Sequence, residues 1–208
     1  MSAPPDRWQI KPPRLYRVLG EHVRRCPDSL RAEVDALGVP LPHDLVLVTC
    51  ASPLRHKRAV EETAYYFRRE THWSTVGYEV ADCGAHPASE TRAFLFLNDN
   101  PERPRAVGAG CFRWRDWENV DSCWALQWVW LHPFERQRGR LSQAWPFFGA
   151  MFGPFAVEPP YSYHMERFLD RRPARVVPTT DGDEMPLYGA HTAEAGVSDG
   201  VAQHAPRR

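Results

Sequence analysis

The chain has 208 residues, and its 26 lysines and arginines balance 26 aspartates and glutamates, so the formal net charge at pH 7 is zero. A neutral chain has no overall field to attract nucleic acid or an anionic membrane, and no apolar run approaches the roughly 20 residues that cross a bilayer. The five cysteines lack the spacing of zinc ligands or of a disulfide framework, which predicts a cytoplasmic protein without a bound metal.

The length predicts one folded domain of about 150 to 170 residues between irregular ends. Residues 1–13 are polar and rich in proline, which indicates an extended or mobile arm. Residues 14–43 indicate an N-terminal helical addition. We expect one short helix over residues 15–22 and a second one in which Leu30 and Val34 share an apolar face.

The main domain is expected over residues 44–177, and it begins with an apolar strand at 44–49. Ser52 before Pro53 is typical of a helix start, and the apolar stripe that follows ends near Glu70. Three strand-like segments come next, at residues 73–80, 92–97 and 106–114. The turn residues between the last two predict an antiparallel hairpin.

Residues 124–131 are almost entirely apolar and rich in aromatic side chains, which predicts a strand covered on both faces. Alternation along this strand predicts that Trp124, Trp128 and Trp130 share one face. Most of these indoles are expected in the core. The alternative is that a subset lines a site for an aromatic or cationic substrate.

A turn rich in arginine follows this strand. Residues 136–140 place three guanidinium groups around Gly139, and a helix is expected over residues 141–152. The unpaired N–H groups and the dipole of a helix start favour a bound anion. Pro146 removes one helical hydrogen bond at a cost of about 3 kcal/mol, so we expect the helix to bend after a turn or two.

The strand, the Leu-His-Pro turn and the pattern Arg136-x-x-Gly139-x-Leu141 resemble the GNAT superfamily of acyl-CoA-dependent N-acetyltransferases. Leu141 departs from the glycine or alanine that the superfamily usually has there. The resemblance implies an α/β (α+β) fold with a mixed, mostly antiparallel twisted sheet flanked by helices. It also implies binding of acetyl-CoA as cosubstrate by Leu131, His132, Arg136, Gln137, Arg138, Gly139, Arg140 and Leu141. The alternative is an ordinary strand-to-helix turn with solvated arginines.

Beyond this turn, residues 155–158 are expected to form a short strand, and Ser162 is expected to cap a helix. A last strand is expected at 175–177. Residues 178–208 carry no periodic pattern, which indicates a mobile tail.

The resemblance also implies catalytic roles. Backbone N–H groups around residues 130–132 would stabilise the oxyanion, and Tyr161 or Tyr163 would protonate the departing thiolate. The segment around Ser162 resembles a region of cohesin acetyltransferases in which a serine assists the reaction. The alternative is that Ser162 only caps a helix and that the tyrosines cover the edge of the core.

Two carboxylates, Glu118 and Glu158, are the candidates for the base that takes the proton of an amine, and both are expected near the mouth of the cleft. The sequence thus favours direct acetyl transfer to an amine of a small molecule or a protein, without a cysteine intermediate. The main alternative is a non-catalytic module that binds coenzyme A or a protein partner. Nucleic acid is a weaker alternative, and a homodimer stays open.

Overall fold

The computed structural model describes residues 25–75, 77–81, 91–100, 104–118, 120–159 and 161–189. Its elements are η2 (Asp28–Leu30), α1 (Arg31–Ala36), β1 (Leu45–Val48), α2 (Leu54–Thr71), β2 (Thr91–Leu97), β3 (Ala106–Trp117), β4 (Val120–Leu131), η3 (Pro133–Glu135), α3 (Arg140–Phe152), β5 (Phe155–Val157), α4 (Tyr163–Leu169), β6 (Arg175–Pro178) and β7 (Glu184–Leu187). The arm expected at 1–13 and the helix expected at 15–22 lie outside the described residues.

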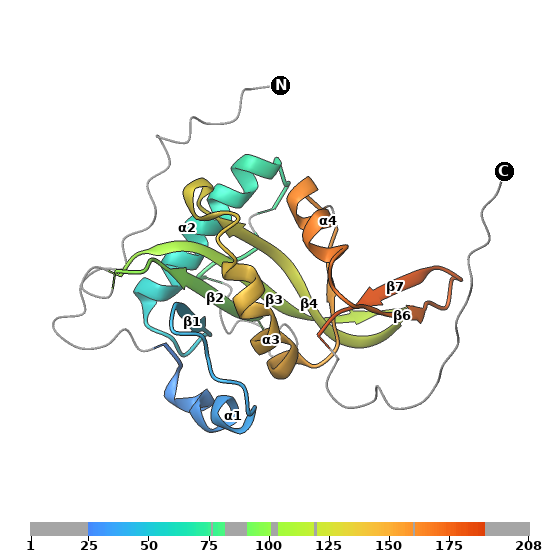
Figure 1. Cartoon of the computed structure of the whole chain (residues 1–208), viewed down its shortest axis with the longest axis horizontal. Coiled ribbons are helices and arrows are strands. Elements are labelled where there is room, and N and C mark those ends of the chain that lie inside the picture. The colour runs from blue at the N-terminus through green and yellow to red at the C-terminus, as the bar shows by residue number, and fades with distance from the viewer. Residues whose placement is uncertain are drawn as a thin grey trace.

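Five strands form one sheet in the order β1-β2-β3-β4-β5 (Figure 1). Neighbours from β1 to β4 are antiparallel, and β5 joins β4 in parallel. One face of the sheet packs against α2. The other face packs against α3 and α4. The predicted class is therefore confirmed: a mixed α/β fold with a mostly antiparallel sheet flanked by helices.

The start of α2 and the segment after it differ from the sequence prediction, whereas the helix ends at Thr71, close to Glu70 as predicted. The hydroxyl of Ser52 accepts a hydrogen bond from the N–H of Thr49 at 3.0 Å, and α2 starts at Leu54 without a side-chain cap. At the other end His72 takes the left-handed conformation, with φ of 60°, and stops the helix. The described residues between 73 and 80 form bends instead of the predicted strand.

A β-bulge divides β4 into two halves. The register against β3 shifts by one residue at Gln127, which has no partner there. Trp124, before the bulge, packs in the core under α3, whereas Trp128 and Trp130, after it, pack in the core under α2. The prediction that the three indoles share one face is wrong, because alternation holds only within an uninterrupted strand.

Helix α3 runs from Arg140 to Phe152 although Pro146 lies inside it, so the expected interruption is not found. Pro146 is exposed, and its neighbours Trp145 and Phe147 are buried in the core together with Phe152. Burial of a large apolar side chain stabilises the fold by about 2–3 kcal/mol. The aromatic side of α3 thus offsets the missing hydrogen bond.

The C-terminal hairpin of β6 and β7 extends the fold past the expected end of the domain. Tyr188, just after β7, is buried and exchanges two backbone hydrogen bonds with Phe155 of β5, both at 2.8 Å. β7 and Tyr188 lie in the segment from residue 178 onward, which the sequence predicts to be a mobile tail. The prediction missed them because this segment has neither strand alternation nor an apolar run. Residues 190–208 lie outside the described part of the chain.

Candidate functional site

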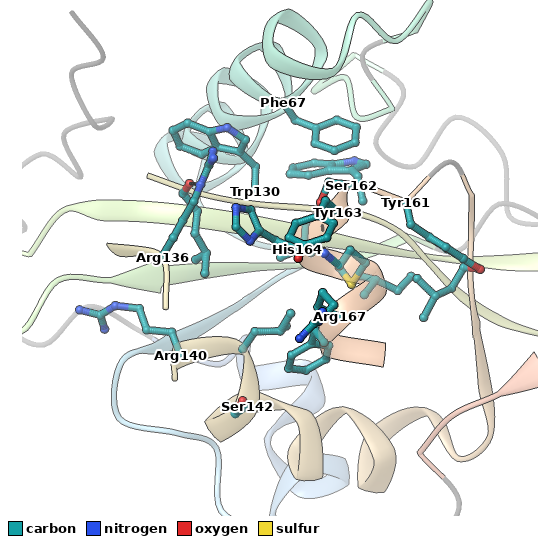
Figure 2. Close-up of a pocket in the computed structure, with 18 of the residues that line it drawn as sticks. Phe67, Trp130, Arg136, Arg140, Ser142, Tyr161, Ser162, Tyr163, His164 and Arg167 are labelled. Carbon is teal, nitrogen blue, oxygen red and sulfur yellow. Dashed lines mark hydrogen bonds between the residues drawn. The ribbon is translucent and has the colours of Figure 1, made fainter. Parts of the chain in front are cut away.

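A pocket of about 730 Å³ opens where β4 extends beyond the end of β5 (Figure 2). Its walls come from the end of α2, the second half of β4, the first turn of α3, the end of β5, and α4 with the residues around it. The predicted site residues in these walls are Leu131, Arg136, Gln137, Gly139, Arg140, Leu141, Glu158, Tyr161, Ser162 and Tyr163. His132, Arg138 and Glu118 do not line it.

The pocket exposes the free edge of β4. Only Trp124 to Leu126 pair with β5, and the strand continues to Leu131 without it. The N–H of His132 donates to the carbonyl of Val107 on β3, at 2.7 Å. Because backbone groups alternate between the two edges of a strand, Val129 and Leu131 direct their N–H groups to the open side. No described residue accepts a hydrogen bond from the N–H of Val129.

This alternation corrects the expected oxyanion donors. The N–H groups of Trp130 and His132 face β3, so they are not available to a ligand in the pocket. His132 is buried, and its Nδ1 accepts from the N–H of Phe134, so the imidazole shapes the turn at the end of β4. The available donors are therefore the N–H groups of Val129 and Leu131.

The first turn of α3 forms the second backbone wall. Gly139 precedes it with φ of 79°, a conformation that favours glycine, and a Cβ there would meet no atom within 4 Å. The first intrahelical bond runs from the N–H of Gln143 to the carbonyl of Gly139, at 2.9 Å. Within the described residues, the N–H groups of Arg140, Leu141 and Ser142 have no acceptor. A helix start of this kind suits an anion.

Arg136 is held by a carboxylate of α2. Its two terminal nitrogens each donate to one oxygen of Glu70, both at 2.6 Å, and its Nε donates to the carbonyl of Leu131. Trp130 donates its indole N–H to the same carboxylate at 2.7 Å. Burial by itself would raise the pKa of Glu70, but the hydrogen bonds from Arg136 and Trp130 outweigh it and lower that pKa. The Glu70–Arg136 pair therefore ties the end of α2 to the turn after β4.

Arg140 is buried and belongs to an acidic cluster. Its guanidinium contacts the carboxylates of Asp44 at 2.9 Å, Asp99 at 3.1 Å and Glu135 at 2.8 Å. Figure 2 shows this side chain directed away from α4. Arg138 is exposed and lies 3.5 Å from Glu135. The arginines of the turn are thus engaged by carboxylates, and the turn offers an anion mainly its backbone N–H groups.

The two predicted bases lie in different places. Glu118 is exposed in the hairpin turn between β3 and β4, eight residues before Leu126, where the pocket wall begins on β4, or roughly 20–25 Å along the strand, so it is not at the mouth of the cleft. Glu158 does line the pocket. Both of its oxygens accept from Arg115, at 2.5 and 2.9 Å, which holds this carboxylate in an ion pair.

The segment before α4 shows how the other candidates are used. The hydroxyl of Ser162 accepts from the N–H of Met165 at 3.2 Å, so this serine is the helix cap that the alternative interpretation predicted. Tyr161 donates to the carbonyl of Val157 at 2.8 Å, and burial raises the pKa of its phenol. Tyr163 is 65% exposed, and its ring lies under the guanidinium of Arg167.

Sequence reasoning missed Glu70 and His164, which lie on α2 and α4 and both line the pocket. His164 lies close enough to Glu70 that its protonated form helps to lower the pKa of that carboxylate. Nothing in the spacing of these residues indicates that α2 and α4 meet beside β4, and only the fold brings them together (Figure 2).

A scan against models of known protein families matched none of them, and a search of curated proteins returned no significant relative. Within the described residues, no three His, Cys, Asp or Glu side chains are grouped as ligands for a metal ion. The described helices also lack an apolar stretch long enough to cross a membrane.

Proposed function

We propose that this protein is an N-acetyltransferase of the GNAT type, which transfers an acetyl group from acetyl-CoA to an amine of a small molecule or a protein. The observation that carries the proposal is the open edge of β4. Among the described residues, the backbone N–H of Val129 has no acceptor, and it borders a pocket that ends at the free N–H groups of the first turn of α3.

The proposed ligand is long, with an acyl group at one end and phosphates at the other. The extended pantetheine arm would lie along β4 beyond the end of β5 and hydrogen bond to the carbonyl of Val129 and the N–H of Leu131, as an added strand does. The diphosphate would lie at Arg140, Leu141 and Ser142 of α3. Leu141 packs partly against the core, which leaves its backbone N–H for the ligand.

In the proposed reaction the amine nitrogen attacks the thioester carbonyl carbon, and a C–N bond forms while the oxygen takes up negative charge. The N–H of Val129 stabilises that charge. The C–S bond then breaks, and its electron pair leaves with the sulfur. The thiolate takes a proton from Tyr161 or Tyr163, or from water. The nitrogen gives its proton to a base, so charge and atoms balance.

We propose His164 as that base, because both carboxylates in the pocket wall are held by arginines. Changing His164 to Gln is expected to lower kcat at neutral pH by about 10²-fold and to leave the Kd of coenzyme A unchanged. The measurement is steady-state acetylation of an amine found by screening, with coenzyme binding by calorimetry. Glu166→Gln, on the same helix outside the pocket, is the matched control. An unchanged kcat in His164→Gln would exclude His164 as the base.

Changing Ser142 to Asp tests the cosubstrate site directly. A carboxylate in the first turn of α3 suits the helix dipole and is expected to stabilise the fold by about 0.3–1 kcal/mol. The same carboxylate would repel and displace a phosphate, so the affinity for acetyl-CoA is expected to fall by at least about tenfold. Calorimetric titration with acetyl-CoA and urea unfolding measure the two effects.

Gln143→Asp is the control for this experiment, because the N–H of Gln143 is already bonded to Gly139 and the residue does not line the pocket. Equal affinities in wild type, Ser142→Asp and Gln143→Asp would contradict the placement of the diphosphate. No binding of acetyl-CoA to folded wild type would overturn the proposed function.

A non-catalytic module that binds coenzyme A is the second candidate. Its support is that Glu70 and Glu158 are both bound by arginines, so neither is free to act as a base. Saturable binding of acetyl-CoA without acetylation of any amine in a broad screen would favour this second function.

A further inference from the structure

Three arginines of α4 and the turn after it line the pocket without a carboxylate partner. They are Arg167, Arg171 and Arg172. Elsewhere in the walls, Arg136 and Arg140 are each held by carboxylates at 3.1 Å or less. Among the described residues, no ion pair reaches the three arginines near α4. The unbalanced positive charge of the pocket therefore lies on the α4 side and not in the turn after β4.

The contacts of these arginines leave their N–H groups for a ligand. The guanidinium of Arg167 lies 5.9 Å from the centre of the Tyr163 ring, and that of Arg172 lies 4.5 Å from the centre of the Phe168 ring. Stacking on a ring uses the face of a guanidinium and not its donors. The Nε of Arg172 is buried and has no hydrogen-bond partner. A buried donor without an acceptor costs free energy, and it leaves Arg172 with no internal acceptor that competes with a bound anion.

The position of the arginines agrees with this role. Arg167 lies in the last turn of α4 and Arg171 in the turn that follows the helix, and both line the pocket. Figure 2 shows Arg167 on the side of α4 that faces α3, where Ser142 lies in the opposite wall. An anion in the pocket would thus have guanidinium groups on one side and the N–H groups of α3 on the other.

We propose that Arg167 and Arg171, supported by Arg172, bind phosphate groups of the cosubstrate, and that Arg136 and Arg140 of the turn are structural. This inference rests on the proposed function, because it takes the ligand to be coenzyme A. Guanidinium groups bind phosphate oxygens through paired charge-assisted hydrogen bonds. The arginines that recognise the cosubstrate then lie about 30 residues after those of the sequence motif.

The test compares three probes of decreasing phosphate content: coenzyme A, 3′-dephospho-coenzyme A and pantetheine. Calorimetric titration measures each Kd for wild type and for the double variant Arg167→Gln/Arg171→Gln. Arg172 is left in place because it packs on Phe168. We expect the double variant to bind coenzyme A at least about tenfold more weakly and to bind pantetheine as wild type does.

The probe at which the difference disappears identifies the phosphate. If the variant binds coenzyme A more weakly than wild type but binds 3′-dephospho-coenzyme A equally well, the arginines contact the 3′-phosphate. If the two proteins differ for both of these probes and agree only for pantetheine, the arginines contact the diphosphate. Arg58→Gln/Arg175→Gln removes the same charge from exposed positions outside the pocket and controls for the long-range field.

Two outcomes overturn the inference in distinguishable ways. If the double variant and wild type bind coenzyme A equally, or if the variant loses the same factor for all three probes, then the α4 arginines do not bind phosphate and the proposed function still stands. If folded wild type binds none of the probes, the proposed function fails together with the inference. Circular dichroism and urea unfolding verify that each variant is folded.

Discussion

Replacing Arg140 by Met is expected to lower the free energy of unfolding by about 3–5 kcal/mol. The guanidinium is the shared partner of Asp44, Asp99 and Glu135, and its side chain is only 5% exposed. Methionine has a similar length but no charge, so it leaves the buried carboxylate of Asp44 without a counter-ion. The measurement is urea unfolding followed by tryptophan fluorescence.

Arg138→Met provides the control, because Arg138 is two residues away, is exposed and makes one long contact with Glu135. Its unfolding free energy is expected to stay within about 1 kcal/mol of wild type. Equal effects of the two substitutions would mean that the cluster around Arg140 contributes little to folding. Arg140 would then be open to a role in ligand binding.

Replacing Val129 by Pro is expected to lower the rate of acetyl transfer by about 10²- to 10³-fold, the usual cost of losing one oxyanion donor. The substitution removes the N–H that faces the pocket. It removes no ladder hydrogen bond within the described part of the chain, because no described strand pairs with this edge of β4 beyond β5, and proline is tolerated at such an edge. Single-turnover acetylation at saturating acetyl-CoA measures the effect.

Val129→Ala keeps the N–H and shortens the side chain, so its rate should stay close to that of wild type. Calorimetry with coenzyme A distinguishes a lost donor from a blocked pocket, since the proline ring lies where the ligand would pass. A normal rate in Val129→Pro, with the fold intact, would show that another group stabilises the oxyanion.

Much of the fold could be predicted because the signals are local. The apolar run of β4, the glycine and arginines of the turn and the capping serine of α4 each lie within a few residues of the element that they define. The position of Gln127 as a bulge could not be predicted, since nothing in the composition of β4 marks the shift in register. β7 was missed because its burial depends on pairing near β5.

The site was predictable in part, for a similar physical reason. Backbone donors follow from secondary structure, so the free N–H groups at the start of α3 could be expected from the turn alone. Which carboxylates pair with the arginines of the site could not be predicted. The partner of Arg136 is 66 residues away at Glu70, and one partner of Arg140 is 96 residues away at Asp44. Spacing along the chain carries no information on such pairs.

The bulge at Gln127 has a consequence for how β4 tolerates changes of length. In an uninterrupted strand Trp128 and Trp130, which follow Trp124 by four and six residues, would share its face, and the extra residue at Gln127 reverses this. Removing Gln127 would place these two indoles three and five residues after Trp124 in a regular strand, so they would stay on the face that packs under α2. A deletion at Gln127 is therefore expected to keep both cores, whereas a deletion of Val129 would direct Trp128 and Trp130 to opposite faces of the sheet.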